Sequence, residues 1–383
     1  MAAAPDGVGG VRHLYVHLPF CSHRCGYCDF VTVVGRPEQH GAYVDAVLLE
    51  LRREGGALTD PPETVFVGGG TPSFTEPDAL RRLLTSLPRA AEVTVEANPE
   101  TVTPEVAALL RECGVNRVSL GAQTFAPSLL AVLERVADPD DVRRAVQTLR
   151  DASFDNVSLD LVYGIPGQEP ADLERDLAEA LALAPEHLSL YELEAKPGTR
   201  FTHAWGKELE RQSEAMEGYF ERVVETLTVA GYRWYETANF CLTGERAAAG
   251  RDLRAHHNLG YWHGHDYLGV GIGAVSTLSG LRRRNGVSIG RYTSALTRGE
   301  EPPRELEQLE LLTQAQERVM LGLRLDEPLA LTGLERALDR DAVARMVQGG
   351  LVVAGTDSAG QETLTLTRRG RFLGGGVTAE LLA

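Results

Sequence analysis

Short apolar runs alternate along the chain with longer segments in which apolar residues recur every three or four positions. The short runs are rich in β-branched residues and are bounded by turn residues, a pattern typical of buried strands. They predict six strands, at Leu14–Leu18, Thr64–Val67, Val93–Glu96, Arg117–Leu120, Asn156–Val162 and His187–Glu192. The amphipathic segments between them predict helices, at Tyr43–Arg53, Asp78–Ser86, Pro104–Glu112, Pro139–Ala152 and Ala171–Leu183.

A strand that is repeatedly followed by a helix predicts an α/β fold, with parallel strands joined by right-handed crossovers. Six strands are too few for a closed eight-stranded barrel, so we expect an open, partial (β/α)6 barrel of the TIM type. Ligands of such folds bind at the carboxyl ends of the strands. We assign residues 10–230 to this barrel, with a long helical segment over Leu209–Ala230 at its end.

The remainder of the chain predicts two smaller units. Residues 231–300 are rich in aromatic residues and glycine and look least like scaffold, so we expect an extension that packs on the barrel and binds a ligand. Glu300–Arg304 is expected to be a linker. Residues 304–383 predict a small α+β winged-helix-like domain, from a helix at Asp341–Gln348 and strands at Leu351–Ala354 and Thr363–Thr367. Its few basic residues favour packing or partner docking over DNA binding.

Composition narrows the classes of function. The 383 residues carry a net charge of −16, which argues against a nucleic-acid-binding protein, because such proteins need a basic face. No apolar stretch approaches the roughly 20 residues of a spanning helix, and the first residues do not resemble a signal peptide. Three of the five cysteines fall within eight positions, which indicates a metal site in a reducing compartment. We therefore expect a cytoplasmic protein without membrane insertion.

The three clustered cysteines, Cys21, Cys25 and Cys28, directly follow the first predicted strand. A structural zinc site would normally have four ligands in paired spacings, and a ferredoxin-type cluster would add a fourth thiolate. The next cysteine is the distant Cys113, and position 30 is Phe30. Three thiolates on one loop therefore favour a 4Fe-4S cluster with one open iron, which S-adenosylmethionine can chelate, over zinc or a fully ligated cluster.

Polar and glycine residues follow several of the other predicted strands. Because carboxyl ends of parallel strands meet at one edge, these residues predict a ligand site rather than separate helix caps. The glycines would let a ligand approach bare backbone, although a tight turn alone also explains a glycine run. The residues are Gly69, Gly70, Thr71, Glu96, Gln123 and Asp160.

The cysteine spacing after the first strand resembles that of the radical S-adenosylmethionine superfamily. Further segments resemble the oxygen-independent coproporphyrinogen III oxidase family over nearly the whole chain: Tyr15–Cys21, Gly68–Pro72, Glu96–Glu100, Ser119–Gln123 and Asp160–Pro166. The resemblance implies a 4Fe-4S cluster on the three cysteines and S-adenosylmethionine at the open iron. It also implies a set of cofactor-binding residues: Tyr15, Tyr27, Gly69, Gly70, Thr71, Glu96, Gln123, Arg135 and Asp160. Of these, Arg135 is open to another interpretation, because exposed arginines are more often solvated.

This family contains oxidases, small-molecule methyltransferases and haem chaperones. The oxidases have a fourth cysteine where this chain has Phe30, whereas His257–Trp262 matches the H-N-x-x-Y-W motif of the haem chaperones. A neutral imidazole is a common axial ligand of haem iron, and aromatic rings offer it a flat surface. The resemblance thus implies a haem site at four residues, His257, Asn258, Tyr261 and Trp262.

We therefore expect a haem chaperone whose partners are haem and apo-haemoproteins such as membrane respiratory enzymes. Three alternatives stay open: His257 is a packing residue, the chain is a radical enzyme that acts on a porphyrinogen or another small molecule, or it is an iron-sulfur protein that does not bind S-adenosylmethionine. Ala137 and Val275 stand where many relatives have histidine, which puts any substrate chemistry of those imidazoles in doubt here. His256, His263 and His265 are further candidate haem ligands.

Overall fold

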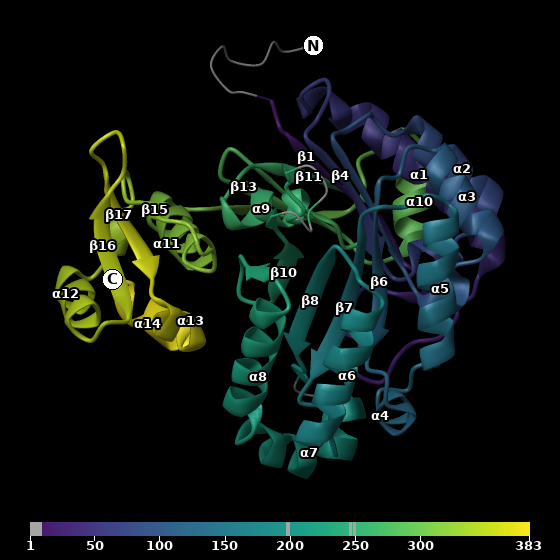
Figure 1. Cartoon of the computed structure of the whole chain (residues 1–383). Coiled ribbons are helices and arrows are strands. Elements are labelled where there is room, and N and C mark those ends of the chain that lie inside the picture. Colours follow the sequence, from purple (N-terminus) through teal and green to yellow (C-terminus); the bar gives the residue numbers. More distant parts are fainter. Residues whose placement is uncertain (1–9, 197–199, 245–246, 248–249) are drawn as a thin grey trace.

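The computed structural model describes residues 10–196, 200–244, 247 and 250–383 (Figure 1). All six predicted strands are present, with bounds that differ by a few residues from those expected. They pair in parallel, each with the next along the chain. They are β1 (His13–Leu18), β4 (Thr64–Gly69), β5 (Glu92–Ala97), β6 (Arg117–Gln123), β7 (Val157–Tyr163) and β8 (His187–Glu192).

The extension adds strands to both edges of this sheet. On one side, β11 (Tyr267–Val270) pairs in parallel with β1, and β12 (Val275–Leu278), β13 (Leu281–Asn285) and β14 (Arg304–Gln308) continue as antiparallel strands. On the other side, β10 (Asn239–Leu242) and β9 (Tyr232–Trp234) follow β8. The result is one open sheet of twelve strands, in the order β14-β13-β12-β11-β1-β4-β5-β6-β7-β8-β10-β9.

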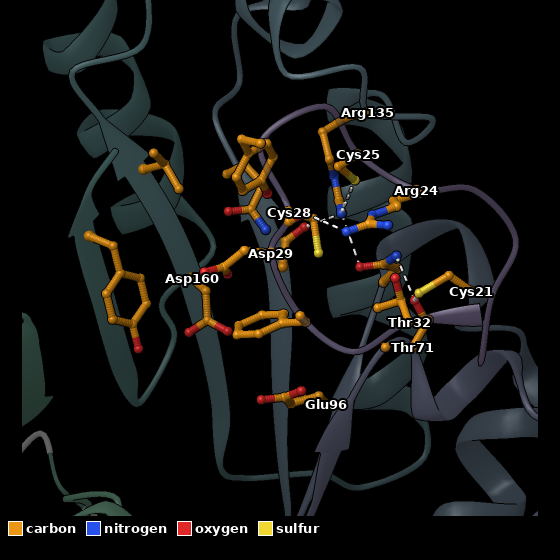
Figure 2. Close-up of a pocket in the computed structure, with 18 of the residues that line it drawn as sticks. Cys21, Arg24, Cys25, Cys28, Asp29, Thr32, Thr71, Glu96, Arg135 and Asp160 are labelled. Carbon is orange, nitrogen blue, oxygen red and sulfur yellow. Dashed lines mark hydrogen bonds between the residues drawn. The ribbon is translucent and has the colours of Figure 1, made fainter. Parts of the chain in front are cut away.

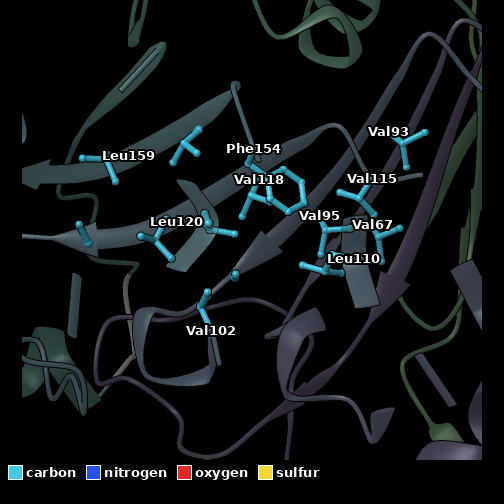
Figure 3. Close-up of a cluster of buried hydrophobic side chains, with 14 of the residues drawn as sticks. Val67, Val93, Val95, Val102, Leu110, Val115, Val118, Leu120, Phe154 and Leu159 are labelled. Carbon is cyan, nitrogen blue, oxygen red and sulfur yellow. The ribbon is translucent and has the colours of Figure 1, made fainter. Parts of the chain in front are cut away.

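Helices cover the outer face of the parallel strands (Figure 1). They are α1 (Pro37–Glu54), α2 (Pro77–Ser86), α3 (Pro104–Glu112), α4 (Pro127–Val132), α5 (Pro139–Asp151) and α6 (Pro170–Ala182), with α10 (Ile289–Thr297) beside α1. The first six each begin with a proline, which fits the first turn because that position has no intrahelical N–H bond to lose. Between helices and sheet, Val67, Val95 and Val118 share one buried cluster with Leu110 and Phe154 (Figure 3).

The helical segment expected over Leu209–Ala230 is present, but it is divided between two helices. The structure has two helices, α7 (Arg200–Ser213) and α8 (Met216–Val229), separated by a turn at Glu214 and Ala215. The amide of Ala215 bonds to the carbonyl of Gln212 at 2.9 Å, which closes this turn and ends the first helix. The local sequence carries neither proline nor glycine there, so the pattern alone gave no reason to expect a break.

The last part of the chain has a hydrophobic cluster of its own, built around Val319 and Leu364. Its elements are α11 (Leu311–Gly322), β15 (Leu329–Ala330), α12 (Arg340–Gln348), β16 (Val352–Thr356), β17 (Glu362–Leu366), α13 (Arg368–Phe372) and α14 (Gly374–Leu381). The three strands form a sheet in the order β15-β17-β16, so the predicted helix and both predicted strands are confirmed. Residues 304–308, however, pair with β13 in the main sheet, because Arg304 reaches the buried Glu50 there.

None of the helices formed by the described residues is both long and apolar enough to cross a membrane.

A buried carboxylate fastens the edge strands to α1. Glu50 is 0% exposed, and it accepts hydrogen bonds from the amide of Gly271, Asn285, Tyr292 and Arg304 at 2.6 to 2.8 Å. A buried charge without its partner is strongly unfavourable.

We predict that Arg304→Met lowers the free energy of unfolding by about 3 kcal/mol, because it leaves the Glu50 carboxylate without its counter-charge. Urea unfolding followed by circular dichroism measures the loss. The matched control is Arg298→Met, which removes an exposed ion pair with Glu300 and should cost less than about 1 kcal/mol. Equal losses in the two variants would contradict the prediction.

Candidate functional site

The cysteine loop is fastened at both of its ends. It leaves β1 through β2 (Phe20–Cys21) and returns in β3 (Val33–Val34), which pairs with β2 in parallel. The amide of Val33 bonds to the carbonyl of Pro19 at 2.8 Å, and that of Gly35 bonds to the carbonyl of Cys21 at 2.9 Å. The cysteines therefore lie on a closed loop above the carboxyl end of β1.

All three cysteines line one cavity of about 370 Å3 at the carboxyl ends of the parallel strands (Figure 2). Eight of the nine residues predicted to bind the cofactor line the same cavity; they are Tyr27, Gly69, Gly70, Thr71, Glu96, Gln123, Arg135 and Asp160. The ninth, Tyr15, lies in a different cavity. The exposed Phe30 is at the wall of the first cavity, in the position that a fourth cysteine would have occupied.

The glycine turn after β4 packs directly against the start of the cysteine loop. The amides of Gly70 and Thr71 bond to the carbonyls of Leu18 and Phe20, each at 2.8 Å. Gly69 has a φ of +118°, and a Cβ atom there would lie 2.6 Å from the His17 ring. The close packing of these two segments thus explains the glycine at position 69 without any ligand.

Gln123 and Arg135 reach the cavity through local irregularities of the backbone. The register of β6 against β7 shifts between Gly121 and Gln123, and Gln123 has a φ of +65°, so this bulge redirects its side chain. Arg135 follows a left-handed residue after α4; it donates to the carbonyl of Gly121 at 2.8 Å and to Asn98 at 3.0 Å. Its guanidinium lies 3.6 Å from the sulfur of Cys25. Arg135 is therefore part of the site and not a solvated helix residue.

Two of the three thiols, Cys21 and Cys28, are poorly suited to act as free nucleophiles. Burial raises the pKa of Cys21 to about 11, against a hydrogen bond from Thr71 at 3.5 Å, and burial also raises the pKa of Cys28. Free thiols of this kind stay protonated at neutral pH, whereas bound iron displaces the proton. Cys113 and Cys241 do not line the cavity, so three cysteines face it in the described part of the chain.

Two carboxylates, Glu96 and Asp160, form the lower wall of this cavity (Figure 2). Burial raises the pKa of Glu96 to about 7, although the amide of Gly69 donates to it at 3.0 Å. Burial also raises the pKa of Asp160, which accepts a hydrogen bond from Ser119 at 2.9 Å. Free carboxylate oxygens at this depth are suited to accept hydrogen bonds from ligand hydroxyl groups.

A second cavity, of about 190 Å3, adjoins the first, since Glu96, Ser119, Asp160 and Tyr191 line both. Its remaining lining residues include three of the four predicted haem-binding residues; they are Tyr15, Phe66, Arg117, Ser189, His257, Asn258 and Tyr261. The structure therefore places Tyr15 and most of the H-N-x-x-Y-W motif inside the barrel.

The motif forms α9 (His256–Trp262), which lies across the amino ends of the strands. His257 is 1% exposed, and its two ring nitrogens lie 2.8 Å from Thr64 Oγ1, at the start of β4, and 3.0 Å from the Tyr261 hydroxyl. Its backbone amide donates to Glu92 at 2.9 Å. Burial lowers the pKa of His257 to about 3, with further lowering by His13 and Arg117. The imidazole is therefore neutral, with both nitrogens engaged.

Trp262, His263 and His265, which follow in the sequence, line neither of the two cavities. Trp262 packs under Arg324, whose guanidinium carbon is 4.5 Å from the ring centre. His265 lies 3.1 Å from His13, nitrogen to nitrogen, and its ring is 5.6 Å from that of His263. Neither Ala137 nor Val275, which stand where many relatives have histidine, lines either of these two cavities.

Sequence reasoning missed several polar residues of these walls, and Arg117 and Tyr191 are two of them. Arg117 was counted only as the first residue of a strand, yet it is 2% exposed and faces the second cavity. A charged residue inside an otherwise apolar strand was the available signal, because arginine is seldom fully buried without a purpose. Tyr191 gave no such signal, since tyrosine is common in strands.

Comparisons with known proteins agree with this geometry. Residues 15–180 match the family model of the radical SAM superfamily. The chain is 37% identical to the protein named heme chaperone HemW of Mycobacterium tuberculosis, over 100% of this chain and 96% of that protein. It is 31% identical to the HemW of Bacillus subtilis, over 97% of this chain and 99% of that protein.

The fold has a close match among solved structures. The coproporphyrinogen III oxidase HemN of Escherichia coli superposes with a TM-score of 0.78 at 21% identity, over 97% of this chain and 90% of that one. The similarity supports the partial barrel, its extension and the C-terminal unit as one architecture. Together with the full-length similarity to the proteins above, it shows that this chain belongs to the HemW family within the radical SAM superfamily.

Proposed function

We propose that this chain is a haem chaperone that carries a 4Fe-4S cluster on Cys21, Cys25 and Cys28, binds S-adenosylmethionine and delivers haem to apo-haemoproteins. The observation that carries the cofactor assignment is that three cysteines of one loop, and no other cysteine among the described residues, line the cavity. The haem assignment is supported by relatives of 31% to 37% identity that are named heme chaperones.

Each residue of the cavity has a role that follows from its chemistry. A bound cluster would supply an electron and an open iron for the amino and carboxylate groups of the cofactor. Arg135 is placed to offset the negative charge of the thiolates, because its guanidinium lies beside Cys25. Glu96 and Asp160 are placed to accept hydrogen bonds from ribose hydroxyls. The remaining proposed contacts are Tyr27, Gln123, Thr71 and the backbone of Gly69 and Gly70 in this cavity, and Tyr15 in the adjoining one.

We predict that Cys28→Ser abolishes stable cluster assembly, because two thiolates cannot hold four irons when one iron is already open. Iron and sulfide are quantified after anaerobic reconstitution and gel filtration. Wild type should retain close to four of each per chain, and the variant less than about one. Cys113→Ser removes a cysteine outside the cavity and should match wild type. Full iron content in Cys28→Ser would refute the assignment.

For haem, we propose the H-N-x-x-Y-W segment as the binding element, with His257 as iron ligand and Asn258, Tyr261 and Trp262 beside it. In the structure both nitrogens of His257 are hydrogen-bonded, so ligation requires one of the two contacts, that with Thr64 or that with Tyr261, to be exchanged for iron. Haem uptake would then involve a shift of α9. We further propose membrane respiratory enzymes as the recipients of the haem.

We predict that His257→Ala weakens haem binding at least about tenfold and changes the Soret band, because an axial ligand is lost. The measurement is a spectrophotometric haem titration of the cluster-containing protein. His256→Ala is the matched control, since that side chain is on the same helix, is 43% exposed and should bind haem as wild type does. Identical spectra and affinities for wild type and His257→Ala would remove His257 from the haem site.

The competing function is radical catalysis, and the intact cofactor cavity is the observation that favours it. We predict no decarboxylation when the reconstituted, reduced protein is incubated anaerobically with S-adenosylmethionine and coproporphyrinogen III. The reason is that Phe30 replaces the fourth cysteine of the oxidases that the sequence resembles. Chromatography of the oxidised porphyrins measures the outcome. Formation of protoporphyrinogen would contradict the chaperone proposal and favour an oxidase.

A further inference from the structure

Arg117 is a buried cation that forms no ion pair with any residue that the structure describes. It is 2% exposed, opens β6 and lines the 190 Å3 cavity between the cofactor cavity and α9. Its Nε atom is buried without a hydrogen-bond partner in the described part of the chain. A buried guanidinium is costly unless opposite charge or hydrogen bonds compensate for it. Groups that compensate for the buried charge of Arg117 are therefore expected on the other walls of this cavity.

Two carboxylates face the same cavity, Glu96 on β5 and Asp160 on β7. Burial raises the pKa values of both carboxyls, hydrogen bonds lower them, and the positive charge of Arg117 lowers both by a smaller amount. Direct hydrogen bonds reach Glu96 from the amide of Gly69 and Asp160 from the hydroxyls of Ser119 and Ser158. Arg117 is thus the cation inside the barrel that opposes their negative charge.

The other titratable groups around the cavity carry no competing charge at neutral pH. His257 on α9 is neutral, because burial lowers its pKa to about 3, and burial likewise lowers the pKa of His187 on β8 well below its ordinary value. Burial raises the pKa values of Tyr15 on β1 and Tyr261 on α9, so both phenols stay protonated. Tyr191, on β8, adds a further phenol to the wall. The charged residues that line the 190 Å3 cavity are therefore Arg117 and the two carboxylates, Glu96 and Asp160.

We propose that Arg117 is a positioning residue of the cofactor site, which keeps Glu96 and Asp160 ionised and ready to accept hydrogen bonds from the cofactor. The inference rests on the proposed function, because it takes these carboxylates as cofactor contacts. His257, Asn258 and Tyr261 close the far side of the cavity and limit the water that would weaken the interaction. The H-N-x-x-Y-W segment on α9 would then also form one wall of the 190 Å3 cavity that adjoins the cofactor cavity.

The test compares cofactor affinity across pH in three variants of the reconstituted protein. Arg117→Met removes the charge at similar length, Arg117→Lys keeps a charge, and Arg81→Met removes an exposed ion pair with Glu112 as a control. Equilibrium binding of S-adenosylmethionine is measured from pH 6 to pH 9, and thermal unfolding shows that each variant is folded.

The expected loss of cofactor affinity follows from the ionisation of Glu96, whose pKa of about 7 leaves it half ionised at pH 7. Loss of a nearby opposite charge raises the pKa of a carboxyl by about one to two pH units. Arg117→Met should therefore bind about 5- to 50-fold more weakly than wild type at pH 7, and within about twofold of it at pH 9. Arg117→Lys should keep the pH profile of wild type, and Arg81→Met should match wild type throughout.

If Arg117→Met binds S-adenosylmethionine more weakly than wild type by the same factor at every pH, the inference is overturned, because Arg117 then has a purely structural role. Equal affinity of Arg117→Met and wild type at every pH would overturn it as well. A wild type that binds no cofactor at any pH would instead refute the proposed cofactor site. The effect of the Arg117 charge on Glu96 is then measured by NMR, from the carboxyl 13C signal of Glu96, which the Glu96→Gln variant assigns. The midpoint of the Glu96 titration must lie at higher pH in Arg117→Met than in wild type. An unchanged midpoint overturns the inference.

Discussion

The parallel register of β1 and β4 is the constraint on which the site depends. It sets Leu18 opposite Gly69, and two further backbone hydrogen bonds, from Gly70 to Leu18 and from Thr71 to Phe20, continue the pairing beyond the strands. The cysteine loop and the glycine turn are thereby held face to face. Because the later strands are also parallel, their carboxyl ends bring Glu96, Gln123 and Asp160 to the same rim.

Inside the rim, the barrel is polar where an ordinary core would be apolar. The 370 Å3 cofactor cavity and the adjoining 190 Å3 cavity share four lining residues. Polar side chains therefore line the interior from the cysteine loop toward α9. Charges and hydrogen bonds offset one another along this path: Arg117 opposes the carboxylates, and His187 bonds to Ser158 and Tyr235. The helix that carries the haem-chaperone motif thus contributes to the cofactor side of the molecule as well as to the proposed haem site.

The sequence was sufficient for the repetitive part of the fold and for most of the site. Apolar runs located β1 and β4 to β8, and strand ends located eight of nine predicted cofactor residues, because parallel strands converge by geometry. The strands β9 to β14 are only three to five residues long, too short for a periodic signal. The position of α9 depends on contacts such as that between Thr64 and His257, which are 193 residues apart. Tyr15, the ninth, lines the adjoining cavity, so its contact with the cofactor stays a prediction.

The central claim is that three thiolates hold a cluster whose fourth iron is open to S-adenosylmethionine. Electron paramagnetic resonance of the reduced, reconstituted protein, recorded before and after addition of S-adenosylmethionine, tests it most directly. The account predicts a clear shift of the g values on addition, because the cofactor becomes a ligand of one iron. A spectrum that stays the same at saturating cofactor would contradict it.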